Sequence, residues 1–343
     1  MKNITKAAEQ WRDDEYPPRR RAIEETLQAP NRWTRSALDH GLDRWMQRLT
    51  KEALKRWISP VSRQEDEPTV AVLHGPEEPL SGFRAAVAVW ALGYPYVGSV
   101  PDASPSLLPA FARDLGEKEG RSIEFAPVEE ALTKADVVLA NPRPEIESLP
   151  ALCDRHGISD DRRLLRPKTF SVGVVDGHES EDEMERLAED MLLYEGKGRR
   201  RLAVLWAPVE HAPDPYLEAM ARFRGLFPAH DDTPGTLQMQ QAFLEARDEP
   251  HAYADDLQFL VSRGDPAPQK AGHVRWTEYD GLDDVHRWWA AHRDEVYAVV
   301  ARRHLHDRCP EAWPLRTPGG VHVPPLDDPE GLRIVSFLEG LVD

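Results

Sequence analysis

The stretch of residues 169–208 most constrains what this chain can fold into. It begins with a short apolar run rich in β-branched residues, 170–175, which predicts a buried strand that ends at an Asp-Gly turn. Ser180 and Glu183 then form a capping-box pattern at the start of an amphipathic helix. A glycine-punctuated loop follows, and residues 202–206 predict a second buried strand. Strand, helix and strand in this order indicate an α/β unit.

The part of the chain that precedes this stretch shows the same alternation. Strands are predicted at 69–73, 96–100, 122–125 and 136–140, and helices at 80–92, 106–115 and 128–134. Strands that alternate with helices are joined by right-handed crossovers, so the pattern predicts a doubly wound, mainly parallel sheet. Sheets of this kind bind ligands at the carboxyl ends of their strands.

The remaining segments complete the expected organisation. Residues 31–59 carry apolar side chains at helical spacing, with Trp45 and Trp57 as expected core anchors and a second helix starting near Thr50. After the opening stretch we expect helices at 214–227 and 237–244, strands at 257–261 and 273–277, and a helix from residue 280. With a charged linker at 62–68, the predicted parts are a helical segment 1–65, α/β domains 66–168 and 169–300, and a C-terminal segment 301–343.

Charge and cysteine content limit the partners. The formal net charge of −17 argues against a nucleic-acid backbone or an anionic membrane surface as partner. No apolar run approaches the roughly 18 residues that a membrane helix needs, so no membrane insertion is expected. Two cysteines are too few for a disulfide framework and indicate a reducing compartment, so we expect a cytoplasmic protein. His304, His306 and Cys309 lack a second ligand pair at zinc-site spacing, so no metal is predicted.

The loop of the opening stretch carries the most specific sequence signal. It reads Tyr-Glu-Gly-Lys-Gly at residues 194–198 and continues into three arginines. This stretch resembles the catalytic segment of the LuxC-type acyl-CoA reductases, a branch of the aldehyde dehydrogenase superfamily, in which such a Gly-x-Gly precedes the nucleophilic cysteine. With Gly196 and Gly198 as the two glycines, the resemblance puts that cysteine at position 199, which is Arg199. A guanidinium cannot form a thioester, because covalent catalysis here needs an ionisable thiol.

The resemblance extends over nearly the whole chain. Pro-Leu-Ser-Gly-Phe at residues 79–83 and Leu-Leu-Pro at 107–109 are similar to the cofactor domain of that family. The resemblance implies an aldehyde-dehydrogenase-like α/β fold with two doubly wound, Rossmann-like lobes, and NADPH-dependent reduction of a fatty acyl thioester to an aldehyde. It would place cofactor loops at Gly75, Ser99 and Asn141.

These loops depart from the family pattern in their polar residues. The loop at Gly75 has two glutamates and lacks the family's asparagine, which would donate to a developing oxyanion. Ser99 stands where a lysine commonly helps to hold the nucleotide. Asn141 is followed by a proline in place of a Gly-Ser pair, and proline lacks the backbone N–H that a phosphate would use.

Two local features have more than one interpretation. Lys197, Arg199, Arg200 and Arg201 form a basic island that either binds an anion, such as a phosphate or the nucleotide part of a CoA thioester, or pairs with carboxylates of the preceding helix. Cys153, three residues before a histidine, is either a relocated nucleophile or a plain buried cysteine.

Two functions are therefore expected as alternatives. The first is a diverged acyl-CoA reductase without its nucleophile, a pseudoenzyme that acts as a binding or assembly partner of an active paralogue. The second is an active reductase that brings NADPH to an acyl-CoA by a route without the usual cysteine. A homo-oligomer or a hetero-assembly with the paralogue is expected by analogy with the superfamily.

Overall fold

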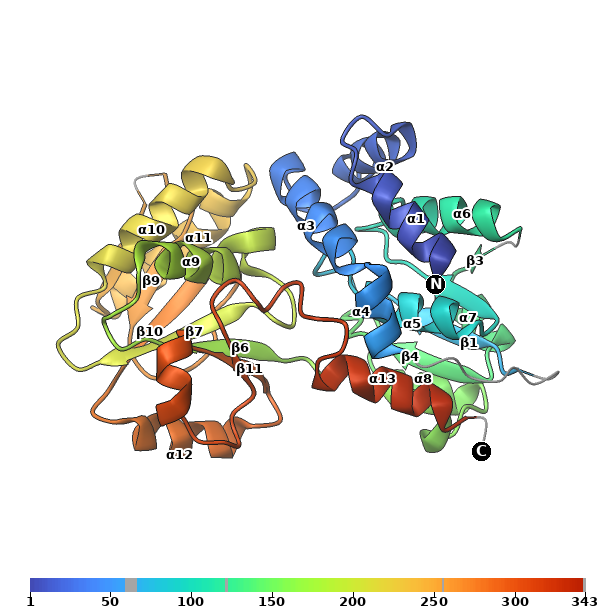
Figure 1. Cartoon of the computed structure of the whole chain (residues 1–343). Helices are drawn as coiled ribbons and strands as arrows, with labels where there is room; N and C mark the ends of the chain where they lie inside the picture. Colours follow the sequence, from blue (N-terminus) through green and yellow to red (C-terminus); the bar gives the residue numbers. More distant parts are fainter. Residues whose placement is uncertain (59–66, 121–122, 255, 342–343) are drawn as a thin grey trace. The chain divides into compact units, whose positions relative to one another are not determined.

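The structure is a computed structural model, and it describes residues 1–58, 67–120, 123–254 and 256–341. The chain forms two compact units, each built around its own sheet (Figure 1). The first unit consists of Met1–Asn31, Leu38–Pro167 and Pro324–Asp343, and the second of Arg32–Ala37 and Lys168–Val323. Most of the linker predicted at residues 62–68 lies outside the described residues.

Within the described residues, the sheet of the first unit has five parallel strands in the order β3-β2-β1-β4-β5. Its strands are β1 (Val70–Leu73), β2 (Tyr96–Ser99), β3 (Glu124–Phe125), β4 (Val137–Ala140) and β5 (Arg163–Leu165). Every residue of β1, β2 and β4 is buried, as is typical of parallel strands covered on both faces. The strand order reverses between β1 and β4, which defines a topological switch point. The predicted doubly wound sheet is confirmed.

Aromatic side chains hold the helices of this unit together. The helices of this unit are, in chain order, α1 (Lys2–Trp11), α2 (Pro17–Leu27), α3 (Arg35–Arg48), α4 (Lys51–Trp57), α5 (Phe83–Leu92), α6 (Leu107–Glu119), α7 (Val128–Lys134), α8 (Leu149–Arg155), the 3₁₀ turn η1 (Asp160–Arg162) and α13 (Pro329–Glu339). Phe111 of α6 meets Trp11 and Phe83 edge-to-face, with ring centroids 5.4 and 5.3 Å apart. Trp45 and Trp57 are buried, so the prediction of tryptophan core anchors is confirmed.

The sheet of the second unit has seven strands over the described part of the chain, in the order β12-β11-β6-β7-β10-β9-β8. They are β6 (Phe170–Val174), β7 (Leu202–Pro208), β8 (His251–Tyr253), β9 (Leu260–Arg263), β10 (His273–Tyr279), β11 (Val296–Val300) and β12 (Leu315–Arg316). All neighbours are parallel except β8, which pairs antiparallel with β9 at the edge. Strand β6 lies between β7 and β11, so the second switch point lies between β6 and β11.

Helices cover both faces of this second sheet, with α12 on one side and α9, α10 and α11 on the other (Figure 1). The elements are α9 (Glu181–Gly196), α10 (Asp214–Leu226), α11 (Thr233–Ala246), α12 (Leu282–His292) and the 3₁₀ helix η2 (Arg303–Arg308). The predicted capping box of Ser180 and Glu183 is present at the start of α9. No helix in the described ranges is long and apolar enough to cross a membrane.

The C-terminal helix α13 is anchored in the first unit by buried charges. Asp328 caps this helix by accepting from the Gly331 N–H at 2.8 Å. The Arg84 guanidinium of α5 donates to the same Asp328 carboxylate at 2.6 Å, and the two side chains are only 3% and 2% exposed. Glu330 pairs with both Arg84 and Arg166. Since both members of the Arg84–Asp328 pair are desolvated, removal of either leaves a buried charge without compensation.

Replacement of Arg84 tests this anchor. We expect Arg84→Met to lower the free energy of unfolding by about 3–5 kcal/mol, because Asp328 then stays buried without its guanidinium. Urea denaturation followed by circular dichroism measures the loss. The matched control is Arg56→Met, which removes an exposed pair with Asp327 and should cost less than about 1 kcal/mol. Equal losses for the two variants would contradict the anchoring role of the buried pair.

Candidate functional site

The switch point of the first sheet brings together the loops that the sequence marked as cofactor loops. Ser99 ends β2, Gly75 lies two residues after β1, and Asn141 directly follows β4. A Cβ built on Gly75 would lie 3.4 Å from the Asn141 Cβ, so the loops after β1 and β4 touch. The Ser99 carbonyl accepts from the His74 backbone N–H at 2.9 Å. This edge is where a doubly wound sheet offers space to a ligand.

His74, the residue after β1, is buried at this edge. Its Nδ1 donates to the Ser81 carbonyl at 2.7 Å, because a carbonyl oxygen can only accept, and its Nε2 therefore accepts from the Tyr96 hydroxyl at 3.0 Å. Burial lowers the pKa of His74 to about 4; the hydrogen bond to Ser81 acts in the opposite direction, and the charge of Arg143 lowers the pKa further. The imidazole is therefore neutral at physiological pH and has both ring nitrogens satisfied.

The start of α5 closes tightly on this imidazole. Gly82 has a φ of +83°, and a Cβ there would lie 2.7 Å from His74 Nδ1 and 2.8 Å from Asn141 Nδ2. The Asn141 amide donates to the Ser81 hydroxyl at 3.1 Å. The cavity left at this edge measures about 10 Å³, which is the space of a single water molecule.

Arg143, the cation at this edge, also has partners within the unit. Arg143 donates to the His74 carbonyl at 2.9 Å and to the Ser99 carbonyl at 3.3 Å. Its guanidinium also pairs with Glu145. Its charge thus serves to bind the ends of β1 and β2 to the loop after β4.

The last residues of α9, which lead to the loop before β7, have an unusual backbone conformation. Tyr194 and Glu195 both have left-handed φ values, 55° and 60°, and so does Gly196 at 61°. The Glu195 carboxylate accounts for this conformation, since it is buried, pairs with Arg224 at 3.4 Å and accepts from the Thr233 hydroxyl. Gly196 is required here because a Cβ would lie 2.8 Å from the Met191 carbonyl oxygen.

Arg199, at the position of the nucleophile in the resemblance, is buried against an aromatic ring. The guanidinium carbons of Arg199 and Arg200 lie 5.2 and 5.5 Å from the centroid of the Tyr297 ring. Their backbone carbonyls accept from the Thr169 and Ser171 hydroxyls at 2.8 and 2.7 Å. The backbone at these two positions is thus tied to the start of β6, and the two side chains pack against Tyr297 of β11.

The other two cations of the predicted basic island lie apart from this stack. Arg201 donates to the backbone carbonyls of Gly196 and Gln269, at 3.0 and 2.5 Å. Lys197 caps the C-terminus of α9 and is half-buried. The structure therefore brings Arg199 and Arg200 together on one ring, whereas Arg201 braces the glycine loop against the segment before β10.

Neither of the other candidate thiol sites has the geometry of a reactive centre. Cys153 is fully buried in α8, which raises its pKa, and His156 is hydrogen-bonded to Glu129 at 2.7 Å. Burial also raises the pKa of Cys309, to about 11. His306 bonds the Ala301 carbonyl at 2.9 Å. Over the described ranges, no three His, Cys, Asp or Glu side chains are grouped to hold a metal ion.

The sequence analysis missed an ion pair at the second switch point. Asp176 follows β6 and Arg302 follows β11, and the two meet in a bidentate pair at 2.7 and 2.9 Å. Burial alone would raise the pKa of Asp176, but Arg302 holds it below its usual value. Beside them, the Tyr216 hydroxyl donates to Glu179 at 2.5 Å. The signal in the sequence was the placement of Asp176 directly after the strand predicted at residues 170–175.

Comparison with known proteins identifies the fold. No protein-family model and no curated protein matches the chain. An indole-3-acetaldehyde dehydrogenase of P. syringae, solved with NAD⁺ and IAA, matches with a TM-score of 0.65 at 14% identity, over 90% of this chain and 72% of that one. A NAD-dependent benzaldehyde dehydrogenase from Corynebacterium glutamicum (TM-score 0.62, 13% identity, 89% and 76% covered) and an E. coli NADP-dependent enzyme (0.64, 12%, 92% and 75%) match equally well. At these identities the likeness shows the fold, which is that of the aldehyde dehydrogenases.

This fold implies a nicotinamide dinucleotide, and the residues at the first switch point do not fit one. A phosphate there would need backbone N–H groups and a cation. The loop after β4 offers Pro142, which has no N–H, and the charge of Arg143 is paired with Glu145. The cavity that His74 lines at this edge measures only about 10 Å³.

The buried state of His74 predicts a pH dependence of stability. Between about pH 6.5 and pH 4 the unfolded chain takes up a proton at this residue and the folded chain does not, so stability falls as the pH falls. In His74→Gln, the loss of unfolding free energy between pH 6.5 and 5 should be smaller by about 1.5 kcal/mol. Urea titrations at the two pH values measure it, with the exposed His178→Gln as control. An unchanged slope in His74→Gln would contradict a buried, neutral imidazole.

Proposed function

We propose that this chain is a non-catalytic, LuxC-type relative of the acyl-CoA reductases, which acts by binding and assembly and not as an oxidoreductase. The observation that carries the proposal is Arg199, which stands at the position of the nucleophilic cysteine in the resemblance and packs against Tyr297. A guanidinium neither ionises to a nucleophile at physiological pH nor accepts an acyl group from a thioester.

The state of the two cysteines supports the same proposal. A cysteine attacks as its thiolate, and both Cys153 and Cys309 have their pKa raised by burial. His156, the histidine nearest Cys153 in sequence, bonds Glu129 and does not activate the thiol. A relocated thiol would need an accessible sulfur with a lowered pKa, which neither residue offers.

The part of the proposal that concerns NADPH is based on the contacts of His74. NADPH, the cofactor that the resemblance implies, would have to displace an imidazole that bonds both the Ser81 carbonyl and the Tyr96 hydroxyl. Asn141 and Arg143 would also have to give up their contacts with neighbouring loops. We infer that the chain does not use NADPH in a hydride transfer.

We infer the partners from the combination of the family's fold with the missing cysteine nucleophile. An acyl-CoA is the ligand class, and an active paralogue with the same fold is the protein partner, since a shared fold allows assembly through equivalent surfaces.

Incubation of the purified chain with NADPH and a long-chain acyl-CoA tests the loss of catalysis. We expect no fall in NADPH absorbance and, by intact mass spectrometry, no acyl adduct on the protein. The double variant Cys153→Ser, Cys309→Ser is the control, and its mass and absorbance traces should match those of the unmodified chain.

An acyl adduct accompanied by NADPH oxidation, both lost in the double variant, would contradict the proposal. That result would establish instead an active reductase that uses a displaced thiol. Acyl-CoA that binds saturably, as measured by calorimetry, without either signal is the result that the proposal predicts.

A further inference from the structure

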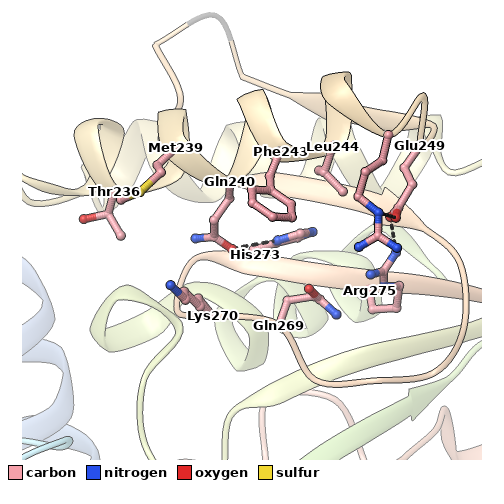
Figure 2. Close-up of a pocket in the computed structure, with 11 residues that line it drawn as sticks. Thr236, Met239, Gln240, Phe243, Leu244, Glu249, Gln269, Lys270, His273 and Arg275 are labelled. Atoms are coloured by element: carbon pink, nitrogen blue, oxygen red, sulfur yellow. Dashed lines mark hydrogen bonds and ion pairs between the residues drawn. The ribbon is translucent and has the colours of Figure 1, made fainter.

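The second unit contains a cavity of about 360 Å³ between α11 and the start of β10 (Figure 2). Small-molecule sites in proteins typically measure about 300–1,000 Å³, so this cavity is large enough for a small ligand. Its lining includes none of the residues that the sequence marked as cofactor loops or as the basic island.

One wall of the cavity is apolar and poorly covered. Met239 and Phe243 project from α11 toward the cavity, one helical turn apart (Figure 2). They are 67% and 68% exposed, whereas Leu237 and Leu244 of the same helix pack on Leu260 in the core. Large apolar side chains exposed beside a hollow mark a surface that a ligand can cover with a gain in free energy.

The opposite wall is cationic, and Arg247 adds a further cation at the end of α11 itself. Arg247 pairs with Glu249 at 3.0 Å, and the same carboxylate lies 3.6 Å from the nine-tenths buried Arg275. Lys270 adds a third cation at the rim (Figure 2). Among the described residues that line the cavity, Glu249 is the one carboxylate, so three cations face a single negative charge. In a chain with a net charge of −17, this local excess of positive charge favours an anion.

The back of the cavity presents a fixed hydrogen-bond donor. His273 donates from Nδ1 to the Gln240 side-chain oxygen at 2.9 Å and accepts from the Ser262 hydroxyl at 2.6 Å. This contact orients the Gln240 amide, whose Nε2 is buried and has no hydrogen-bond partner in the described structure. A buried donor without a partner costs free energy that an acceptor on a ligand would recover.

His273 itself remains uncharged. Burial lowers its pKa to about 3, and the neighbouring charges of Arg275 and Arg201 and the proximity of His251 act in the same direction. The imidazole therefore holds Gln240 in one orientation across physiological pH and does not compete with Lys270 for the anion.

We propose that this cavity binds a small amphipathic carboxylate. The carboxylate lies between Lys270 and the Gln240 amide, and its apolar chain or ring covers Met239 and Phe243. Both halves of the ligand are needed, because the apolar wall and the charged wall face each other across one hollow. The inference goes beyond the proposed acyl-CoA ligand and does not depend on it.

Isothermal titration calorimetry with octanoate tests this site, with octanol and octylammonium as head-group controls. We expect octanoate to bind saturably with one site per chain, octanol to bind at least about tenfold more weakly, and octylammonium not to bind. Octanol binding as tightly as octanoate, or no saturable octanoate binding, would overturn the proposal.

Matched variants assign the binding to this cavity. Lys270→Gln and Phe243→Ala change exposed side chains, so both variants should fold, and each should weaken octanoate binding by about tenfold. Lys168→Gln and Leu226→Ala remove an exposed cation and an exposed apolar residue elsewhere in the same unit. These two should leave the affinity unchanged. Octanoate affinity that survives both Lys270→Gln and Phe243→Ala would place the ligand elsewhere and overturn the proposal.

Discussion

A neutral imidazole at the switch point of the first sheet is the constraint on which the rest of this unit's chemistry depends. His74 bonds the Ser81 carbonyl and the Tyr96 hydroxyl, and so links the end of β1 to the start of α5 and to β2. The left-handed Gly82 is needed because no side chain fits against this imidazole. In doubly wound folds ligands bind at this edge, and here His74, Asn141 and Arg143 are hydrogen-bonded to neighbouring loops.

In each unit, the side chains at the positions where the resemblance implies chemistry are bonded to or packed on other residues of the same unit. In the first, Arg143 donates to the His74 carbonyl and pairs with Glu145. In the second, Arg199 replaces the thiol that the resemblance implies and stacks on Tyr297, while the left-handed turn that precedes it is kept by the buried Glu195–Arg224 pair. The backbone framework persists in both because apolar strands and glycine turns specify it, and the reactive side chains contribute little to that framework.

Periodicity in the sequence was sufficient to locate most strands. Local turns determine the residues at which these strands begin and end. The strand expected at 257–261 begins only at Leu260, because Leu257 takes a left-handed φ of 54° in a turn. The sequence also indicated that the loops of Gly75, Ser99 and Asn141 lie together, because each follows a predicted strand and parallel strands end at one edge of the sheet. The bond from His74 to Tyr96 was not predictable, because it depends on side-chain orientation between separate strands. The cavity beneath α11 was not predictable for the same reason, because its cations come from positions scattered along the sequence.

The measurement that tests the account most directly is a calorimetric titration of the purified chain with NADPH and with NADH, beside an active dehydrogenase as positive control. Because His74 is hydrogen-bonded to the Ser81 carbonyl and Arg143 is paired with Glu145, we predict no saturable binding of either nucleotide up to millimolar concentration. Saturable micromolar binding of either one, with one site per chain, would contradict the account and show that the first unit remains a working cofactor domain.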